Sequence, residues 1–86
     1  MKLNLYVIRD QRTTYMTPSV DYNDASAVRN FEHAVLNKDS LFNSHAEDYS
    51  LYRIGTFDNE TGRISAEEMP VLILDGKDFG NFKEVR

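Results

Sequence analysis

Hydrophobic and polar positions alternate at the start of residues 3–9, which have the sequence Leu-Asn-Leu-Tyr-Val-Ile-Arg. This alternation, together with the β-branched and aromatic residues, is typical of a β-strand. After a short polar break at 10–12, we expect residues 13–17 to return as a hairpin partner of the first strand. Pro18 should end that partner, because proline cannot donate a backbone hydrogen bond to a sheet. The pattern therefore predicts an N-terminal β-hairpin.

The hydrophobic spacing changes to three and four residues in the next segment, and this predicts one main helix at about 24–37. Asn23 or Asp24 can cap its first turn, since a side-chain oxygen there accepts a hydrogen bond from a free backbone N–H. We expect the apolar stripe of this helix to pack against Leu5 and Val7 of the first strand. The stripe consists of Ala27, Val28, Phe31, Ala34 and Val35.

The second half of the chain is predicted to be mainly β-structure. Residues 49–57 have the composition of a long strand, and 58–62 form a hairpin loop in which Gly62 can take a positive φ angle. A return strand begins at 63–65, and 71–74 form the last strand. The predicted order is ββαβββ, which gives an α+β fold with a small, mostly antiparallel sheet.

The predicted strands are apolar on both of their faces, whereas a single helix covers only one face of a sheet. The assignment above leaves Tyr6 and Ile8 of the first strand on the face away from the helix. Tyr52 and Ile54 of the long strand lie on that same face. Another element has to cover these side chains, because exposed apolar patches of this size are unusual on monomers.

The candidate covers are a second subunit, a bound ligand and the C-terminal tail at 77–86. The tail is mostly polar, and we expect it to be loosely ordered. A twofold-related copy buries more apolar surface, and twofold symmetry is the commonest closed arrangement of subunits. We therefore expect a homodimer or a larger homo-oligomer, with Tyr6, Ile8 and Ile54 in its interface.

Length and composition narrow the range of functions. The 86 residues allow one domain, residues 1–86, with a single small core. The formal net charge of −4 argues against a chain that coats nucleic acid or an anionic membrane by bulk attraction. The chain has no cysteine, which excludes disulfides and thiolate zinc sites. Its apolar runs are short and no signal-peptide pattern is present, so we expect a soluble intracellular protein without a membrane partner.

Catalytic and metal-binding patterns are missing from the sequence. His33 and His45 lie twelve positions apart and fit no metal-ligand spacing. No serine lies in the context of a nucleophile elbow, and the four glycines form no phosphate-binding loop. We therefore expect no metal, no cofactor and no enzyme activity.

Arginine and tyrosine side chains leave the binding of single-stranded nucleic acid as a candidate function. Arg9, Arg12 and Tyr15 lie on the predicted first hairpin, and Tyr52 and Arg53 lie on the long strand. Unpaired bases stack on aromatic rings, while nearby arginines contact the backbone phosphates. The same residues are compatible with an ordinary solvated hairpin surface, and the negative net charge favours a protein-docking role instead.

Several segments together resemble a known phage family. The most specific part is the run Arg-Asn-Phe-Glu-His-Ala-Val at 29–35, followed by Leu-Tyr-Arg-Ile-Gly at 51–55. From about residue 5 to residue 75, the chain resembles the small nonstructural protein of gokushovirus-type microviruses, which are phages with a circular single-stranded DNA genome. The segments that carry the likeness are 6–10, 23–35, 39–49 and 51–58.

The resemblance implies a protein of the infected bacterial cytoplasm that is absent from the virion. It also implies a role like that of the phiX-type C protein, which favours single-stranded genome synthesis and packaging over duplex replication. No site residue transfers with this likeness. Two hypotheses follow: an accessory factor that binds single-stranded DNA, and a factor that docks on phage or host replication and assembly proteins without touching DNA.

Overall fold

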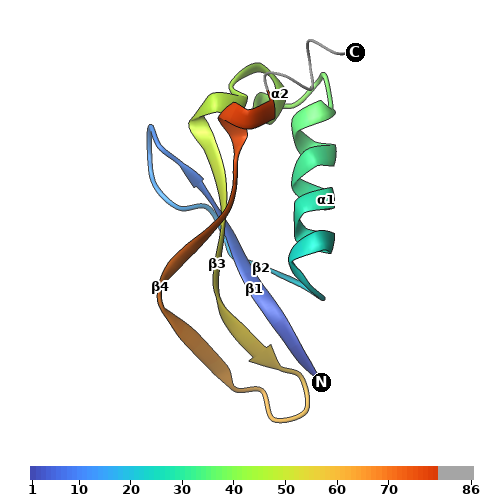
Figure 1. Cartoon of the computed structure of the whole chain (residues 1–86), viewed down its shortest axis with the longest axis vertical. Helices are drawn as coiled ribbons and strands as arrows, with labels where there is room; N and C mark the ends of the chain where they lie inside the picture. Colours follow the sequence, from blue (N-terminus) through green and yellow to red (C-terminus); the bar gives the residue numbers. More distant parts are fainter. Residues whose placement is uncertain (80–86) are drawn as a thin grey trace.

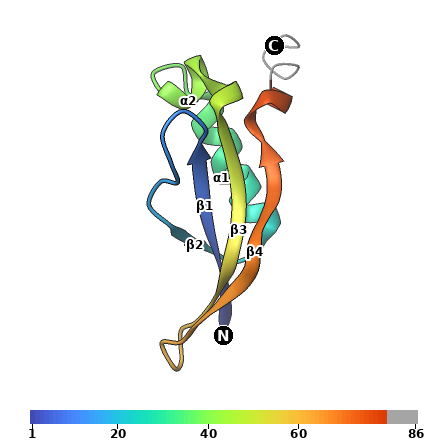
Figure 2. The same cartoon turned by 90° about the vertical axis from the view of Figure 1, so that its left-hand side faces the viewer.

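A four-stranded antiparallel sheet carries one main helix on one of its faces (Figures 1 and 2). The computed structural model describes residues 1–79. The sheet has the spatial order β2-β1-β3-β4. Its strands are β1 (Lys2–Asp10), β2 (Ser19–Asp21), β3 (Tyr49–Asp58) and β4 (Ile64–Asp75). The helical elements are α1 (Asp24–Leu36), α2 (Leu41–Ser44), η1 (Ala46–Asp48) and η2 (Gly76–Phe79). The predicted α+β class, with a mostly antiparallel sheet and one main helix, is confirmed.

The helix α1 begins where the sequence predicts it. The side chain of Asn23 accepts a hydrogen bond from the backbone N–H of Ser26, and Asp24 adds a negative charge to the first turn. The buried face of the helix is formed by Ala27, Phe31 and Val35, three residues of the predicted stripe. The predicted helix at 24–37 is therefore confirmed, with its end one residue earlier.

The face of β1 that packs against the helix is the opposite of the one we expected. Tyr6 is 1% exposed and belongs to the core beneath α1, and Ile8 packs against that core. The prediction that α1 packs on Leu5 and Val7 is therefore wrong. Both alternating sets of β1 side chains are apolar, so the pattern alone does not decide between them. The hydroxyl of Tyr6 decides it, because it reaches Asp24 at the start of α1 while the ring fills the core.

This placement also corrects the predicted subunit interface. Tyr6 and Ile8 pack inside the core of the single chain and are not available to a second subunit. Ile54 is half-buried. The C-terminal residues 80–86, which include most of the tail considered as an alternative cover, lie outside the described residues.

The N-terminal hairpin pairs later in the chain than predicted. Residues 13–17 form no regular strand, and their only ladder contact within the described chain is an isolated bridge between Arg9 and Tyr15. Regular pairing comes after Pro18, where β2 lies antiparallel to Asn4–Tyr6. Pro18 therefore precedes the partner strand and does not end it. The intervening loop extends from the sheet on the side away from α1 (Figure 1).

The two predicted strand segments at 63–65 and 71–74 belong to one strand, β4, so the order is ββαββ. The pairing with β3 is interrupted between Arg53 and Gly55, where the partner in β4 changes from Val71 to Ala66. Pro70 lies within this irregular stretch, on an edge strand that tolerates proline. Within residues 1–79, no helix is long and apolar enough to cross a lipid bilayer.

Candidate nucleic-acid interface

The sheet has one face that α1 does not cover, and Figure 2 looks onto this face with the helix behind the strands. Because side chains alternate along a strand, Leu3, Leu5 and Val7 lie here once Tyr6 and Ile8 face the helix. The register adds Tyr52, which pairs with Val7, and three further partners complete the surface. These are Val20 opposite Leu5, Leu72 opposite Tyr52, and Tyr15 from the loop. We call this surface the uncovered face.

Three of the five residues predicted to bind nucleic acid come together on the uncovered face. The rings of Tyr15 and Tyr52 meet edge to face, with their centroids 6.0 Å apart and their planes at 72°. The guanidinium carbon of Arg9 lies 5.8 Å from the centroid of the Tyr15 ring, within the range of a cation–π contact. Tyr15 is 45% exposed. Part of its ring is therefore open to solvent and available for stacking.

Arg12 lies on the same loop but is already engaged. Its Nε lies 3.4 Å from Oδ2 of Asp48, and the neighbouring Gln11 donates its backbone N–H to the carbonyl oxygen of Asp48. These contacts attach the loop to η1. The Arg12 side chain is still largely exposed, so its pair with Asp48 is a weak surface ion pair that can exchange with a phosphate.

Arg53 does not belong to this interface. Its Nη1 donates to Oδ2 of Asp24 at 2.8 Å on the helix-covered side, and its Nη2 lies 3.8 Å from Glu67. Oδ1 of Asp24 also accepts a hydrogen bond from the hydroxyl of Tyr6 at 2.6 Å. Burial, followed by this bond to Asp24, raises the pKa of Tyr6 to about 12. Arg53 therefore neutralises a structural carboxylate, and its role as a predicted DNA contact finds no support in its position.

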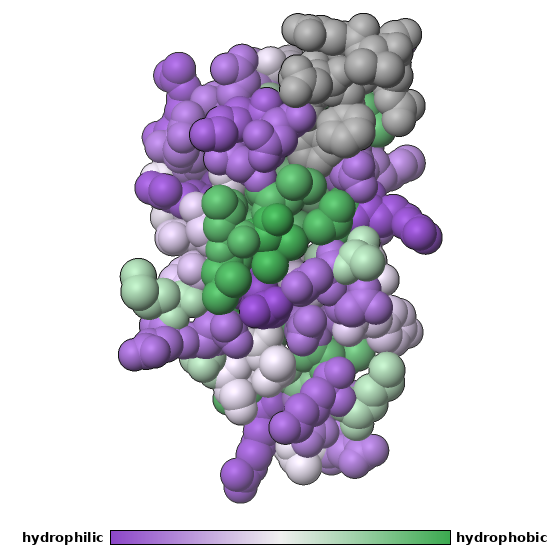
Figure 3. Space-filling view, viewed as in Figure 1, coloured by the Kyte–Doolittle hydropathy of each residue, from purple (hydrophilic) through white to green (hydrophobic). Residues whose placement is uncertain are grey.

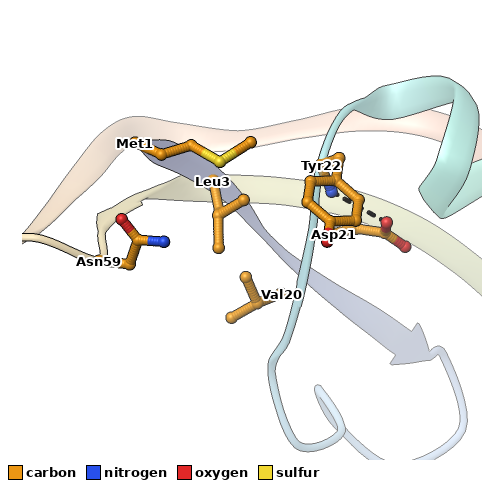
Figure 4. A pocket seen from close by; sticks show the side chains of 6 residues that line it. All are labelled: Met1, Leu3, Val20, Asp21, Tyr22 and Asn59. Carbon is orange, nitrogen blue, oxygen red and sulfur yellow. Dashed lines mark hydrogen bonds between the residues drawn. The ribbon is translucent and has the colours of Figure 1, made fainter.

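A hollow of about 280 Å³ opens near the end of β1 that is distant from Arg9 (Figure 4). Asp21 is held by two bonds, since Oδ1 accepts the backbone N–H of Tyr22 and Oδ2 accepts the side-chain amide of Asn30. The lining residues are Met1, Leu3, Val20, Asp21, Tyr22 and Asn59. Sequence reasoning missed this hollow because its residues come from three separate segments. The one available signal was Tyr22, an aromatic residue in a polar stretch.

The described residues 1–79 contain no group of three or more histidine, aspartate or glutamate side chains arranged to hold a metal ion. His33 and His45 are both exposed, and Nδ1 of His45 lies 2.7 Å from the hydroxyl of Ser44.

A family model matches nearly the whole of the described chain. This model, described as phage ORF5 protein, matches residues 3–79. The chain belongs to the phage ORF5 protein family. The matched range includes β3, all of β1 except Lys2, the loop with Tyr15, and the lining residues of the hollow other than Met1. The family match therefore shows that the chain is a phage protein, which is the broader part of what the resemblance implies. No curated protein and no solved structure matches the chain.

Proposed function

We propose that this phage protein is a non-enzymatic accessory factor that binds single-stranded DNA through the uncovered face. In this proposal it acts in the synthesis and packaging of a single-stranded genome, as the likeness to gokushovirus-type microviruses implies. Its place of action is the cytoplasm of the infected bacterium, and it is not a component of the virion. The observation that carries the proposal is the cluster of Arg9, Tyr15 and Tyr52.

The arrangement of this cluster suits unpaired bases. A four-stranded sheet with helical cover on one face and aromatic rings on the other is a known platform on which single-stranded nucleic acid stacks. Tyr15 presents part of its ring to solvent, and its edge contact with Tyr52 restrains it. Stacking on such a ring contributes about 1–3 kcal/mol per base. Arg9, beside the same ring, supplies the positive charge for a neighbouring phosphate.

The electrostatics predict weak, moderately salt-dependent binding. The net charge of −4 provides no general attraction for DNA, so binding depends on a few local contacts. If Arg9 and Arg12 each neutralise one phosphate, the log–log dependence of affinity on salt has a slope of about −1.4 for a single strand. We expect a dissociation constant in the micromolar range or weaker.

A salt titration of a fluorescently labelled twelve-nucleotide DNA strand tests the proposal. Replacing Arg9 by Gln should reduce the slope by about 0.7, because one phosphate contact is lost. Tyr15→Ala should weaken binding by about 1–3 kcal/mol and leave the slope unchanged. Leu41→Ala is the control, since Leu41 is an exposed apolar residue of α2 and lies outside the cluster. Absence of binding at low salt would overturn the proposal.

A protein-docking role without DNA contact is the second candidate. Figure 3 shows hydrophobic residues gathered at mid-height of the molecule, at about the level where β3 and β4 cross in Figure 1. Along β4, Leu72 is 52% exposed and its neighbours Val71 and Ile73 are half-buried. The partly exposed apolar side chains at 71–73 and the negative net charge both favour a protein partner. In this role the partner is a replication or assembly protein of the phage or of the host. This role gains support if Leu72→Lys abolishes phage production while oligonucleotide binding is absent.

A further inference from the structure

We propose that the hollow beside Tyr22 is a second nucleobase subsite on the uncovered face. This inference rests on the proposed function, because it assumes that a single DNA strand follows β1. It adds a second contact point, remote from Tyr15, and so gives the bound strand a defined path.

The two sites lie on one face of one strand. Leu3 and Val20 both line the hollow, and Val20 pairs with Leu5 of β1. Arg9 lies on the same face of β1, six residues after Leu3, which is a separation of about 20 Å along an extended strand. A DNA strand that runs along β1 therefore meets Tyr15 at one end and the hollow at the other.

The lining of the hollow combines apolar walls with a stackable ring and a side-chain amide. Leu3 and Val20 extend from neighbouring strands toward the same space, and the amide of Asn59 points toward them (Figure 4). Tyr22 is 68% exposed at the opposite end, so its ring can lie against a base. The side chain of Asp21 is turned toward α1, where Oδ2 accepts from Asn30, so the polar group among these side chains is the Asn59 amide. An amide both donates and accepts, which suits the polar edge of a base.

A base fits this hollow better than an aliphatic side chain of a protein partner. An aliphatic group would cover the Asn59 amide without forming a hydrogen bond to it, and that desolvation is unfavourable. A base has an apolar face for Tyr22 and Val20 and a polar edge for the amide. The backbone N–H of Asn59 also donates to the carbonyl oxygen of Met1, which holds one wall of the hollow in place before any ligand arrives.

The experiment compares Tyr22→Ala, Tyr22→Phe and Tyr15→Ala with the unmodified protein, using the labelled twelve-nucleotide strand. We expect Tyr22→Ala to weaken binding about 5- to 150-fold with an unchanged salt slope, since stacking and not charge is lost. Tyr22→Phe should retain nearly full affinity. Leu41→Ala is the matched control, because Leu41 has the same 68% exposure as Tyr22. In NMR titrations, the amide signals of Val20 and Asn59 should shift with DNA.

The outcomes separate this inference from the proposed function. An unmodified protein that binds no oligonucleotide overturns the proposed function, and the subsite with it. Binding that depends on Tyr15 but not on Tyr22, with the amide signals of Val20 and Asn59 unmoved, overturns the subsite alone. Binding that falls in both alanine variants and is restored by Tyr22→Phe supports both.

Discussion

The hydroxyl of Tyr6 donates a hydrogen bond of 2.6 Å to Oδ1 of Asp24, and this bond joins the central strand β1 to the first turn of α1. The other carboxylate oxygen of Asp24 accepts from Arg53 on β3. Asn4 in turn donates its side-chain amide to the Tyr6 oxygen. One carboxylate therefore fixes the helix to both central strands of the sheet, with each of its oxygens satisfied.

Removing the Tyr6 hydroxyl should destabilise the fold without changing its packing. Tyr6→Phe keeps the ring in the core but leaves Asp24 with one fewer donor, and we expect a loss of about 1–3 kcal/mol in the free energy of unfolding. Urea denaturation measures this loss. Tyr22→Phe is the control, because the Tyr22 side chain is exposed and should lose almost nothing. Equal stability of the two variants would show that the bond to Asp24 contributes little.

The raised pKa of Tyr6 predicts a loss of stability in alkali. Burial raises this pKa from 10.0 to about 12 in the folded chain, so the unfolded chain releases the phenolic proton first. Stability from this group is complete below pH 10 and falls as the pH rises toward 12. The full shift corresponds to about 3 kcal/mol.

Thermal or urea unfolding between pH 8 and pH 12 tests this dependence, and Tyr6→Phe should flatten most of it. A smaller slope should remain in that variant, since burial also raises the pKa of Tyr49. An identical pH profile in the variant and the unmodified protein would contradict the assignment to Tyr6.

The core position of Phe31 predicts a large effect of truncation. Phe31 is buried on α1 together with Val35, facing Tyr6 across the core. Phe31→Ala should lower the free energy of unfolding by about 3–5 kcal/mol, because a cavity replaces the ring. The exposed Leu41→Ala variant should change it by less than about 0.5 kcal/mol. A loss below about 1 kcal/mol for Phe31→Ala would show that the helix packs on a different face.

The homodimer remains a prediction, now with a different surface. Tyr6 and Ile8 are used within the chain, whereas Leu72 on the edge strand β4 is exposed and free to meet a second copy. Sedimentation equilibrium at micromolar concentration should give twice the chain mass of 10.0 kDa. Leu72→Lys should return a species of single mass. A 10.0 kDa species for the unmodified protein would refute the dimer.

The helix could be predicted from local signals in the sequence, whereas features that depend on long-range contacts could not. The cap at Asn23 and the three- and four-residue spacing act within one segment, so the sequence alone shows them. The face that β1 turns to the helix depends on Asp24, eighteen residues away, and hydropathy carries no information about that bond. The sequence also does not show that Arg53 is engaged by Asp24, because these two residues are distant in the chain. Arg53 therefore resembles a free DNA-binding residue when the sequence is considered alone.

The site was predictable in part. Arg9 and Tyr15 are close in sequence and pair across a short loop, so their proximity could be expected from the hairpin. Tyr22 follows β2 in a stretch without periodicity, and its neighbours in the hollow come from the chain start and from the β3–β4 turn. Only the folded chain brings these residues together.

The central pair of the sheet has a consequence for how the protein folds during synthesis. In this pair Lys2 lies opposite Asp58 and Asp10 lies opposite Tyr49, so the paired residues are 39 to 56 positions apart in the sequence. Until β3 has left the ribosome, β1 has only the three-residue strand β2 as a regular partner. Loops of this length make folding slow, and an unpaired apolar strand is a template for aggregation. The nascent chain should therefore depend on the chaperones of its host until its last third has been made.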